Sequence, residues 1–306
     1  MLDQAAELRK LVLRSLREPA PDGSPPPQQL VLCGAAAGVG VTTLSVNLAV
    51  ALSGQGCRVV LVDGDCQRPD VAVLCGLAPS AGIGDVLAAR RDIHEVLQPG
   101  PGGIQVVVGS EWAGQSPTWG EFAQQRLLRQ LARLGRHADW IVLDAGSGGH
   151  EVMRRFWRAA SQVLLVTTPE TWTQSESCAA LQRRVCSERP VWLRLLVNGV
   201  PDQRVAREIQ RALEVASESL REGNLELLGC VPCVAEIAAA GQTPVAGELW
   251  SGESPLTRAM DSVATRLLAE KPQGVCVCRA QGALSANCLN PADFTQPQPS
   301  FSPIDI

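Results

Sequence analysis

The sequence predicts a doubly wound α/β fold, with a mostly parallel β-sheet and helices on both of its faces. Two observations predict it: short runs that are apolar on both faces, as buried parallel strands are, and helix-period segments that alternate with these runs from Gln29 onward. Parallel strands need crossover connections, so this alternation favours one sheet covered on both sides. The expected strands are QLVLCG, RVVLVDGD, IQVVVGS, WIVLDAG, QVLLVTTP, WLRLLVNG and LELLGCVP.

A short amphipathic helix is expected before the sheet, over residues 2–17. Its apolar side chains recur about one helical turn apart, with basic residues between them. The segment PAPDGSPPPQ that follows is too rich in proline to continue the helix and is expected to form a semi-extended tether. The apolar positions are Leu2, Ala5, Leu8, Val12 and Leu16.

The last helix is expected over SPLTRAMDSVATRLLAEK, with Ser254 as its N-cap and Pro255 at its first position. Beyond Lys271 the chain has little periodicity and much proline, serine and asparagine, so we expect a disordered tail. The predicted organisation is an N-terminal helix at residues 1–18, a linker at 19–28, a main domain at 29–270 and a tail at 271–306.

The composition is that of a folded protein, with 45% apolar residues and a net charge of -4 from 27 basic and 31 acidic residues. This balance supplies no overall field for nucleic acid or anionic lipid, so any such contact needs a local patch. No stretch approaches the roughly 18 apolar residues of a membrane span, and the N-terminus carries charge where a signal peptide is apolar. We therefore expect a cytoplasmic protein.

The 11 cysteines are an odd number and lie mostly in apolar strand or helix patterns. They are expected to be small buried side chains in a reducing compartment. Cys230 and Cys233 have the spacing of a redox or zinc motif, but with no matching second pair, packing is the favoured interpretation.

A turn of small residues, GAAAGVGVTT, leads directly from the first expected strand into an apolar helix. Such a turn points several backbone N–H groups at one spot, with the positive end of the helix dipole behind them. That arrangement favours a phosphate group. The alternative is an ordinary βα corner that happens to contain glycine and alanine.

Acidic side chains follow two further expected strands. Asp63 and Asp65 end RVVLVDGD, and Asp144 precedes a glycine-rich turn in WIVLDAGSGG. Because the carboxyl ends of parallel strands meet at one edge of a sheet, these carboxylates are expected beside the phosphate loop. Such a set is typical of a magnesium and water-activation site.

The order GxGxTT, VDGD, VLDAGSG, VLLVTTPE and LLVNGV resembles the MinD/ParA family of deviant Walker P-loop ATPases over about residues 29–270. The resemblance implies ATP or ADP and Mg²⁺ as cofactors. The nucleotide-binding loop would consist of Gly38, Val39, Gly40, Val41, Thr42 and Thr43.

The same resemblance implies roles for single residues. Thr42 would hold Mg²⁺, and Asp144 would support the hydration shell of the metal. Asp65 would belong to the metal site and would orient the attacking water. Asp63, beside it, would be the second catalytic residue. The base would contact Asn198 and the Pro232 loop, although Asn198 also fits an ordinary turn residue after a strand.

The loop departs from the family pattern at both lysines. Where the family writes KGGxGKTT, this chain has Ala36 for the first lysine and Val41 for the second. Lysine occurs only at Lys10 and Lys271, so no ammonium group is available between them. Loss of such a charge-assisted contact is worth roughly 1.5–3 kcal/mol, and phosphoryl transfer depends on positioned positive charge. We therefore predict weak nucleotide binding and feeble or absent hydrolysis.

The N-terminal DQAAELR resembles the DQAxxLR motif of FlhG-type regulators of flagellar number. The resemblance implies a partner, the signal-recognition-type GTPase FlhF, with Gln4 near its nucleotide and Leu8 and Arg9 docking the helix that begins near Asp3. A helix folded back on its own domain or lying on a membrane is the alternative. The resemblance further implies flagellar switch components as partners, a homodimer, and a place at the membrane or cell pole. The basic membrane-targeting helix of such proteins is not found, because Arg279 is the only basic residue after Lys271.

Three rival interpretations remain. Arginine from a neighbouring loop (Arg68, Arg154 or Arg155) could replace the missing lysines and keep an ATPase active. A tyrosine autokinase is suggested by DGDCQRPD, but the chain contains no tyrosine. A ParA-like DNA segregation factor would need a basic patch, and the arginines of an expected helix (Arg126, Arg129, Arg133 and Arg136) are more simply a solvated face.

Overall fold

The computed structural model describes residues 25–65, 67–78, 80–110, 121–147, 156–157, 160–172, 192–216, 225–233 and 254–270. The predicted N-terminal helix with Asp3, Gln4, Leu8 and Arg9 lies outside these residues, as do the predicted tail and two of the candidate arginines, Arg154 and Arg155.

One eight-stranded sheet organises the described residues, in the order β3-β4-β2-β5-β1-β6-β7-β8. All neighbouring strands are parallel except β3 and β4, so the predicted doubly wound fold is confirmed. The strands are β1 (Gln28–Gly34), β2 (Val59–Asp63), β3 (Leu97–Pro99), β4 (Gln105–Val107), β5 (Trp140–Asp144), β6 (Gln162–Thr167), β7 (Trp192–Asn198) and β8 (Leu225–Val231).

Every expected strand is present, and the structure adds one that the pattern did not predict. Strand β3 is three residues long, ends in Pro99 and pairs antiparallel with β4 at the edge of the sheet. A strand this short shows no measurable alternation, and proline is tolerated there because an edge strand has unpaired backbone groups on one side. Local periodicity therefore carried no signal for it.

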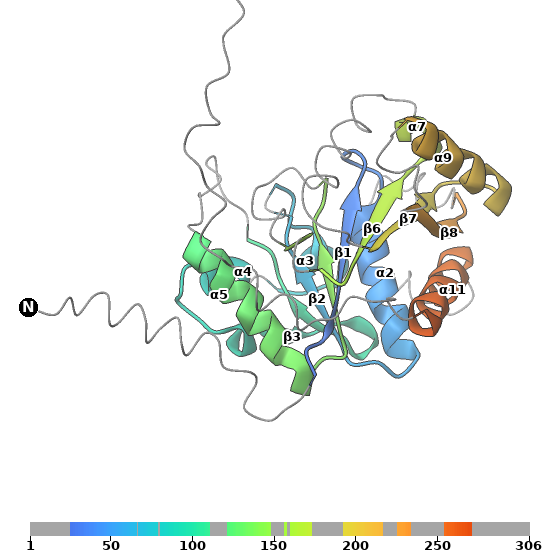
Figure 1. Ribbon diagram of the computed structural model, residues 1–306. Helices are drawn as coiled ribbons and strands as arrows, with labels where there is room; N and C mark the ends of the chain where they lie inside the picture. Colours follow the sequence, from blue (N-terminus) through green and yellow to red (C-terminus); the bar gives the residue numbers. More distant parts are fainter. Residues whose placement is uncertain are drawn as a thin grey trace, which may run out of the picture. The chain divides into compact units, whose positions relative to one another are not determined.

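Helices cover both faces of the sheet (Figure 1). The longer ones are α2 (Val41–Gly54), α5 (Glu121–Ala132), α9 (Gln203–Ala216) and α11 (Pro255–Ala269). Short turns of helix complete the layers: α3 (Val71–Leu74), α4 (Ile83–Leu87), η1 (Ile93–Glu95), η2 (Pro101–Gly103), η3 (Arg133–Arg136) and α7 (Pro169–Trp172). No helix in the described part of the chain is both long and apolar enough to cross a membrane.

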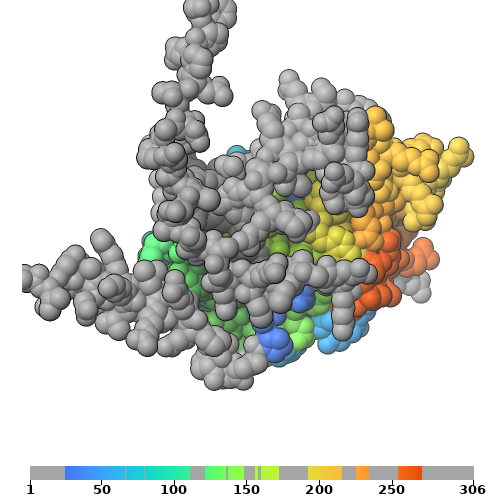
Figure 2. All heavy atoms as spheres, viewed as in Figure 1, coloured from blue at the N-terminus to red at the C-terminus, as the bar shows by residue number. Residues whose placement is uncertain are grey.

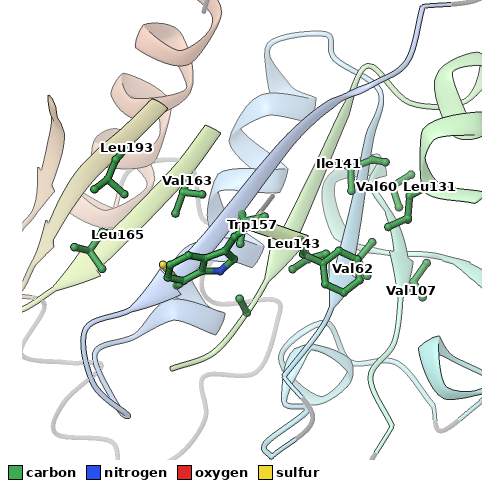
Figure 3. Close-up of a cluster of buried hydrophobic side chains, with 14 of the residues drawn as sticks. Val60, Val62, Val107, Leu131, Ile141, Leu143, Trp157, Val163, Leu165 and Leu193 are labelled. Atoms are coloured by element: carbon green, nitrogen blue, oxygen red, sulfur yellow. The ribbon is translucent and has the colours of Figure 1, made fainter. Parts of the chain in front are cut away.

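Two apolar clusters, one on each face, form the core. In β1 the side chains alternate, so that Val31 belongs to one cluster and Leu30 to the other. Helices α4, α5 and α9 contribute to the cluster of Val31, part of which Figure 3 shows around Trp157. Helices α2, α3 and α11 contribute to the cluster of Leu30. Burial on both faces explains why the strands are apolar throughout their length.

The last helix begins as predicted. The Oγ of Ser254 accepts a hydrogen bond from the Thr257 N–H at 3.0 Å, and Pro255 occupies the first helical position. Helix α11 contacts α2 and β8, and α9 also contacts β8. Figure 2 shows the outer surfaces of α9 in yellow and α11 in orange at this edge of the molecule.

Two of the arginines that were expected on a solvated face, Arg126 and Arg129 of α5, are half-buried. Arg126 donates hydrogen bonds to the carbonyl oxygens of Val86 and Arg91. Arg133 is exposed as predicted. The two half-buried guanidinium groups adjoin the helix side that packs on the core, so they serve packing first and are poor candidates for a DNA-binding surface.

Candidate nucleotide site

The glycine-rich loop lies between β1 and α2 at the carboxyl edge of the sheet. The N–H of Gly34 donates to the Gly146 carbonyl oxygen, and the N–H of Ala35 donates to that of Val166, both at 2.8 Å. The loop is therefore held between the segment after β5 and strand β6. Strands β2 to β5 lie on one side of β1 and strands β6 to β8 on the other, so the loop after β1 lies where the strand order changes sides, which is the position where doubly wound sheets bind ligands.

The loop presents unpaired backbone donors. No described residue accepts a hydrogen bond from the N–H groups of Gly38, Gly40, or the first three residues of α2. Gly40 adopts a left-handed conformation, with φ of 92°, and a Cβ there would lie 2.7 Å from the Asn198 Nδ2. The loop thus has the donors and the helix N-terminus that an anion requires.

Asn198 braces this loop. Its Nδ2 donates to the carbonyl oxygen of Val39 at 3.0 Å. Pro232 follows β8, whose last residue, Val231, accepts hydrogen bonds from the N–H groups of Gly199 and Val200. Asn198 and Pro232 therefore lie at the same edge of the sheet as the loop, and their contact with a base stays a prediction.

The valines of the loop are turned into the core. Val39 is 1% exposed and Val41 is 6% exposed, and both belong to the apolar cluster of α2. A Cβ on Gly34 would lie within 3 Å of a methyl group of each valine, so these methyl groups pack closely over the end of β1. The position where the family has its loop lysine therefore supplies packing and no charge.

A pocket of about 240 Å³ opens beside the loop. It brings together the loop, the turn after β2 and the turn after β5, as predicted, and Arg68 is the one basic side chain in its described lining. The lining residues are Ala36, Ala37, Gly38, Gly40, Val41, Thr42, Thr43, Asp65, Gln67, Arg68, Asp70, Leu74, Gly146 and Ser147.

Asp65 reaches this pocket from the turn after β2. Its Oδ1 accepts the N–H groups of Gln67 at 2.8 Å and Arg68 at 3.1 Å, which fixes the turn. A Cβ on Gly146 would lie 2.0 Å from the Asp65 Oδ2, so only glycine lets the turn after β5 approach this carboxylate. The pairing of Asp65 with the phosphate loop was predicted, whereas Gln67, Asp70 and Ser147 were not.

Asp63 and Asp144 lie side by side at the ends of β2 and β5 and are fully buried. Asp63 accepts the N–H groups of Asp65 and Val71, both at 3.2 Å, so it shapes the β2–α3 turn. The Oδ1 of Asp144 accepts the Gly146 N–H at 2.9 Å, while its buried Oδ2 has no hydrogen bond of standard geometry within the described residues. An unsatisfied buried carboxylate oxygen is where a metal or its water would be accommodated.

Burial raises the pKa of both carboxyl groups. The pKa of Asp144 rises to about 6, because burial and the charges of Asp65 and Asp70 outweigh the Gly146 N–H and the Thr42 hydroxyl, which lower it. Burial and then the charge of Asp144 raise the pKa of Asp63 well above its usual value. Within the described residues no three His, Cys, Asp or Glu side chains form a metal-binding group, so the set Thr42, Asp65 and Asp144 stays a prediction.

The buried acid predicts a pH dependence of stability. A carboxyl pKa that is higher in the folded state stabilises the fold at low pH, and this contribution is lost as the pH rises from about 4 to about 6. Asp144→Asn should remove that loss, so the change in the free energy of unfolding from pH 4 to pH 7 should be more favourable in the variant than in wild type by on the order of 2–3 kcal/mol. Urea unfolding with a chelator present, at several pH values, measures it.

Asp139 provides a control of opposite sign. A hydrogen bond from Arg58 lowers the pKa of Asp139, so its contribution is present above its unfolded pKa and is lost as the pH falls. Asp139→Asn should therefore flatten the acidic limb of the profile. A variant at Asp144 that leaves the wild-type profile unchanged would show that this group does not titrate from a buried position.

Within the described residues, Cys230 and Cys233 belong to no group of three or more possible metal ligands. Cys230 is half-buried and Cys233 is exposed, and both are free thiols. Burial, and then the charge of Asp202, raises the pKa of Cys230, which disfavours the thiolate that a metal or a redox reaction needs.

The family model of the CobQ/CobB/MinD/ParA nucleotide binding domain matches residues 30–245. The chain belongs to this family. The match spans the loop, the acidic strand ends and Asn198, and the observed fold agrees with the family assignment.

Two curated proteins are similar to the chain at 24–28% sequence identity. Antiactivator FleN of Pseudomonas aeruginosa is 28% identical over 207 residues, covering 68% of this chain and 74% of FleN. Flagellum site-determining protein YlxH of Helicobacter pylori is 24% identical over 205 residues, covering 63% and 66% of the two chains.

Solved structures of the family share the fold. MinD cell division protein of Aquifex aeolicus superposes with a TM-score of 0.61 at 19% identity, covering 80% of this chain and 98% of MinD. MinD of Pyrococcus horikoshii, solved with Mg-ADP, gives a TM-score of 0.58 at 17% identity and covers 84% and 99%.

Proposed function

We propose that this protein is a nucleotide-binding regulator that binds ATP or ADP with Mg²⁺ weakly, hydrolyses ATP slowly or not at all, and controls flagellar number, flagellar placement or another polar assembly through an FlhF-like GTPase. The similarity to the flagellum site-determining protein YlxH supports the flagellar setting, and the similarity to the antiactivator FleN supports a regulatory role. The main support for weak binding and slow hydrolysis is a glycine-rich loop that has unpaired backbone N–H groups and no lysine.

The residues present suit a magnesium nucleotide. The unpaired N–H groups of the loop would receive phosphate oxygens, and Thr42 with Asp65 would hold the metal while Asp144 supports its waters. Bound Mg²⁺ would neutralise charge on the phosphates. Because Asp65 and Asp70 line the pocket, a polyphosphate without a cation would meet net negative charge.

Calorimetric titration with ATP and ADP, with Mg²⁺ or with a chelator, tests binding. We expect measurable binding that depends on Mg²⁺. Phosphate release from Mg-ATP should be close to that of an Asp65→Ala control, since both lack efficient transition-state stabilisation. Turnover far above this control would establish the rival proposal, an active ATPase that uses arginine in place of lysine. No binding of either nucleotide would overturn the proposed function.

The partner is tested separately, because DQAAELR lies outside the described residues. A peptide of residues 1–18 should accelerate GTP hydrolysis by a purified FlhF-like GTPase, and the same peptide carrying Gln4→Ala should not. A Lys10→Ala peptide, altered just outside the motif, is the matched control. Equal stimulation by the Gln4 and Lys10 variants would contradict the role proposed for Gln4.

A further inference from the structure

We propose that Arg68 supplies the positive charge that the phosphate loop lacks, by pairing its guanidinium with the outer phosphate groups of a bound nucleoside di- or triphosphate. This inference rests on the proposed nucleotide binding and assigns the charge to one of the arginines that the sequence left as alternatives. Arg68 lies in the turn after β2 and not in the phosphate loop itself.

The backbone at Arg68 is held in place beside the pocket. Its N–H donates to the Asp65 Oδ1 at 3.1 Å, and its carbonyl oxygen accepts the Asp70 N–H at 2.9 Å. Asp65 is in turn fixed by the Asp63 Oδ1, which accepts its N–H. The side chain therefore leaves from an ordered turn, which reduces the entropy lost when the guanidinium binds an anion.

The guanidinium of Arg68 has one long ion pair and no side-chain hydrogen bond within the described residues. The side chain is 76% exposed, and its nearest carboxylate contact is 3.9 Å from Nε to the Asp70 Oδ2, too long for a hydrogen bond. In contrast, Arg58 and Arg194 each donate to a carboxylate at 3.1 Å or less.

The charged side chains that line the pocket explain why a positive charge from Arg68 would matter for binding a phosphate group. Without Arg68, the charged groups in the described lining are Asp65 and Asp70 alone, both acidic. An arginine fork pairs with two phosphate oxygens at once, and such charge-assisted bonds are among the stronger polar contacts in proteins. A group of this kind can offset part of the loss caused by Val41, although it approaches from another loop.

Calorimetry with Mg-ATP on the full chain tests the proposal. Arg68→Ala should weaken binding about tenfold to a hundredfold, and Arg68→Lys, which keeps the charge without the fork, should lie between it and wild type. Arg211→Ala, which removes an exposed arginine of α9 outside the pocket lining, should bind as wild type. Adenosine, which has no phosphate, should show no difference between wild type and Arg68→Ala.

A rescue variant separates charge from structure. If Arg68 takes over the task of the family lysine, then Val41→Lys should restore most of the affinity that Arg68→Ala loses. Because the side chain is exposed, the melting temperature of Arg68→Ala should match that of wild type, so that a loss of binding is not a loss of fold.

The outcomes are distinct. Wild-type affinity for Mg-ATP in the Arg68→Ala variant would overturn this inference and leave the proposed function standing. A wild-type protein that binds neither ATP nor ADP would overturn both. An equal loss in Arg211→Ala would show that net charge, and not a contact by Arg68, controls affinity.

Discussion

Val41→Lys is expected to strengthen Mg-ATP binding about tenfold to a hundredfold and to raise ATP turnover about a hundredfold. Val41 is the first residue of α2 and is one of the residues that line the pocket. A lysine there can lay its methylene stem over the loop and bring the ammonium group to the phosphates. Calorimetry measures the first effect and phosphate release the second.

The double variant Val41→Lys with Asp65→Ala is the control for turnover. It should keep the gain in affinity, which is electrostatic, and lose most of the gain in rate, which also needs an oriented water. Because Val41 is 6% exposed and packed in the core, some loss of stability accompanies the substitution, and thermal unfolding monitors it. A well-folded variant with wild-type affinity and turnover would mean that the missing lysine is not what limits this site.

Arg194→Met is expected to lower the free energy of unfolding by about 3 kcal/mol. Arg194 lies on β7, is fully buried, and is paired with Glu226 at 3.0 Å and with Glu270 at the end of α11. Its guanidinium also lies 3.9 Å from the centre of the Trp192 ring. Methionine retains volume but leaves two partly buried carboxylates without their main partner. Urea denaturation measures the change.

Arg204→Met is the matched control for Arg194. Arg204 is 87% exposed and forms an ion pair with Glu208 one helical turn away, at 3.4 Å, so its loss should cost less than about 0.5 kcal/mol. Adding Glu226→Gln to Arg194→Met should recover part of the stability, since it removes a partly buried carboxylate that keeps only the longer ion pair with Arg266, at 3.7 Å. Equal costs for the two arginine variants would show that burial does not strengthen the Arg194 pair.

The strands and the phosphate loop were predictable because their signals are local. A run such as LVLC is apolar at every position. The segment GAAAGVGVTT contains, within ten residues, both the small residues that predict a turn and the start of the helix that follows. The same kind of signal located the cap at Ser254. Edge strand β3 had no such signal, because three residues ending in proline carry too little pattern.

The neighbours of each side chain were less predictable. Asn198 was expected to contact a base, which stays a prediction, but nothing in the sequence indicated that its amide also donates to the Val39 carbonyl oxygen, 159 residues earlier in the chain. Arg126 was expected in solvent, and it binds carbonyl oxygens beside α4. Each contact depends on which strand lies next to which, and side-chain periodicity contains no information on strand order.

By itself, the sequence determined that this protein is a doubly wound α/β protein with a phosphate-type loop and no lysine between residues 11 and 270. Those facts follow from composition, from periodicity and from the order of short motifs. Only the tertiary structure decided that Arg68 lines the pocket with an exposed guanidinium whose ion pair with Asp70 is long, while the guanidinium of Arg194 is buried in close ion pairs. The reason is physical: whether a charge is available depends on the dielectric and the partners around it, and folding brings these together from distant parts of the chain.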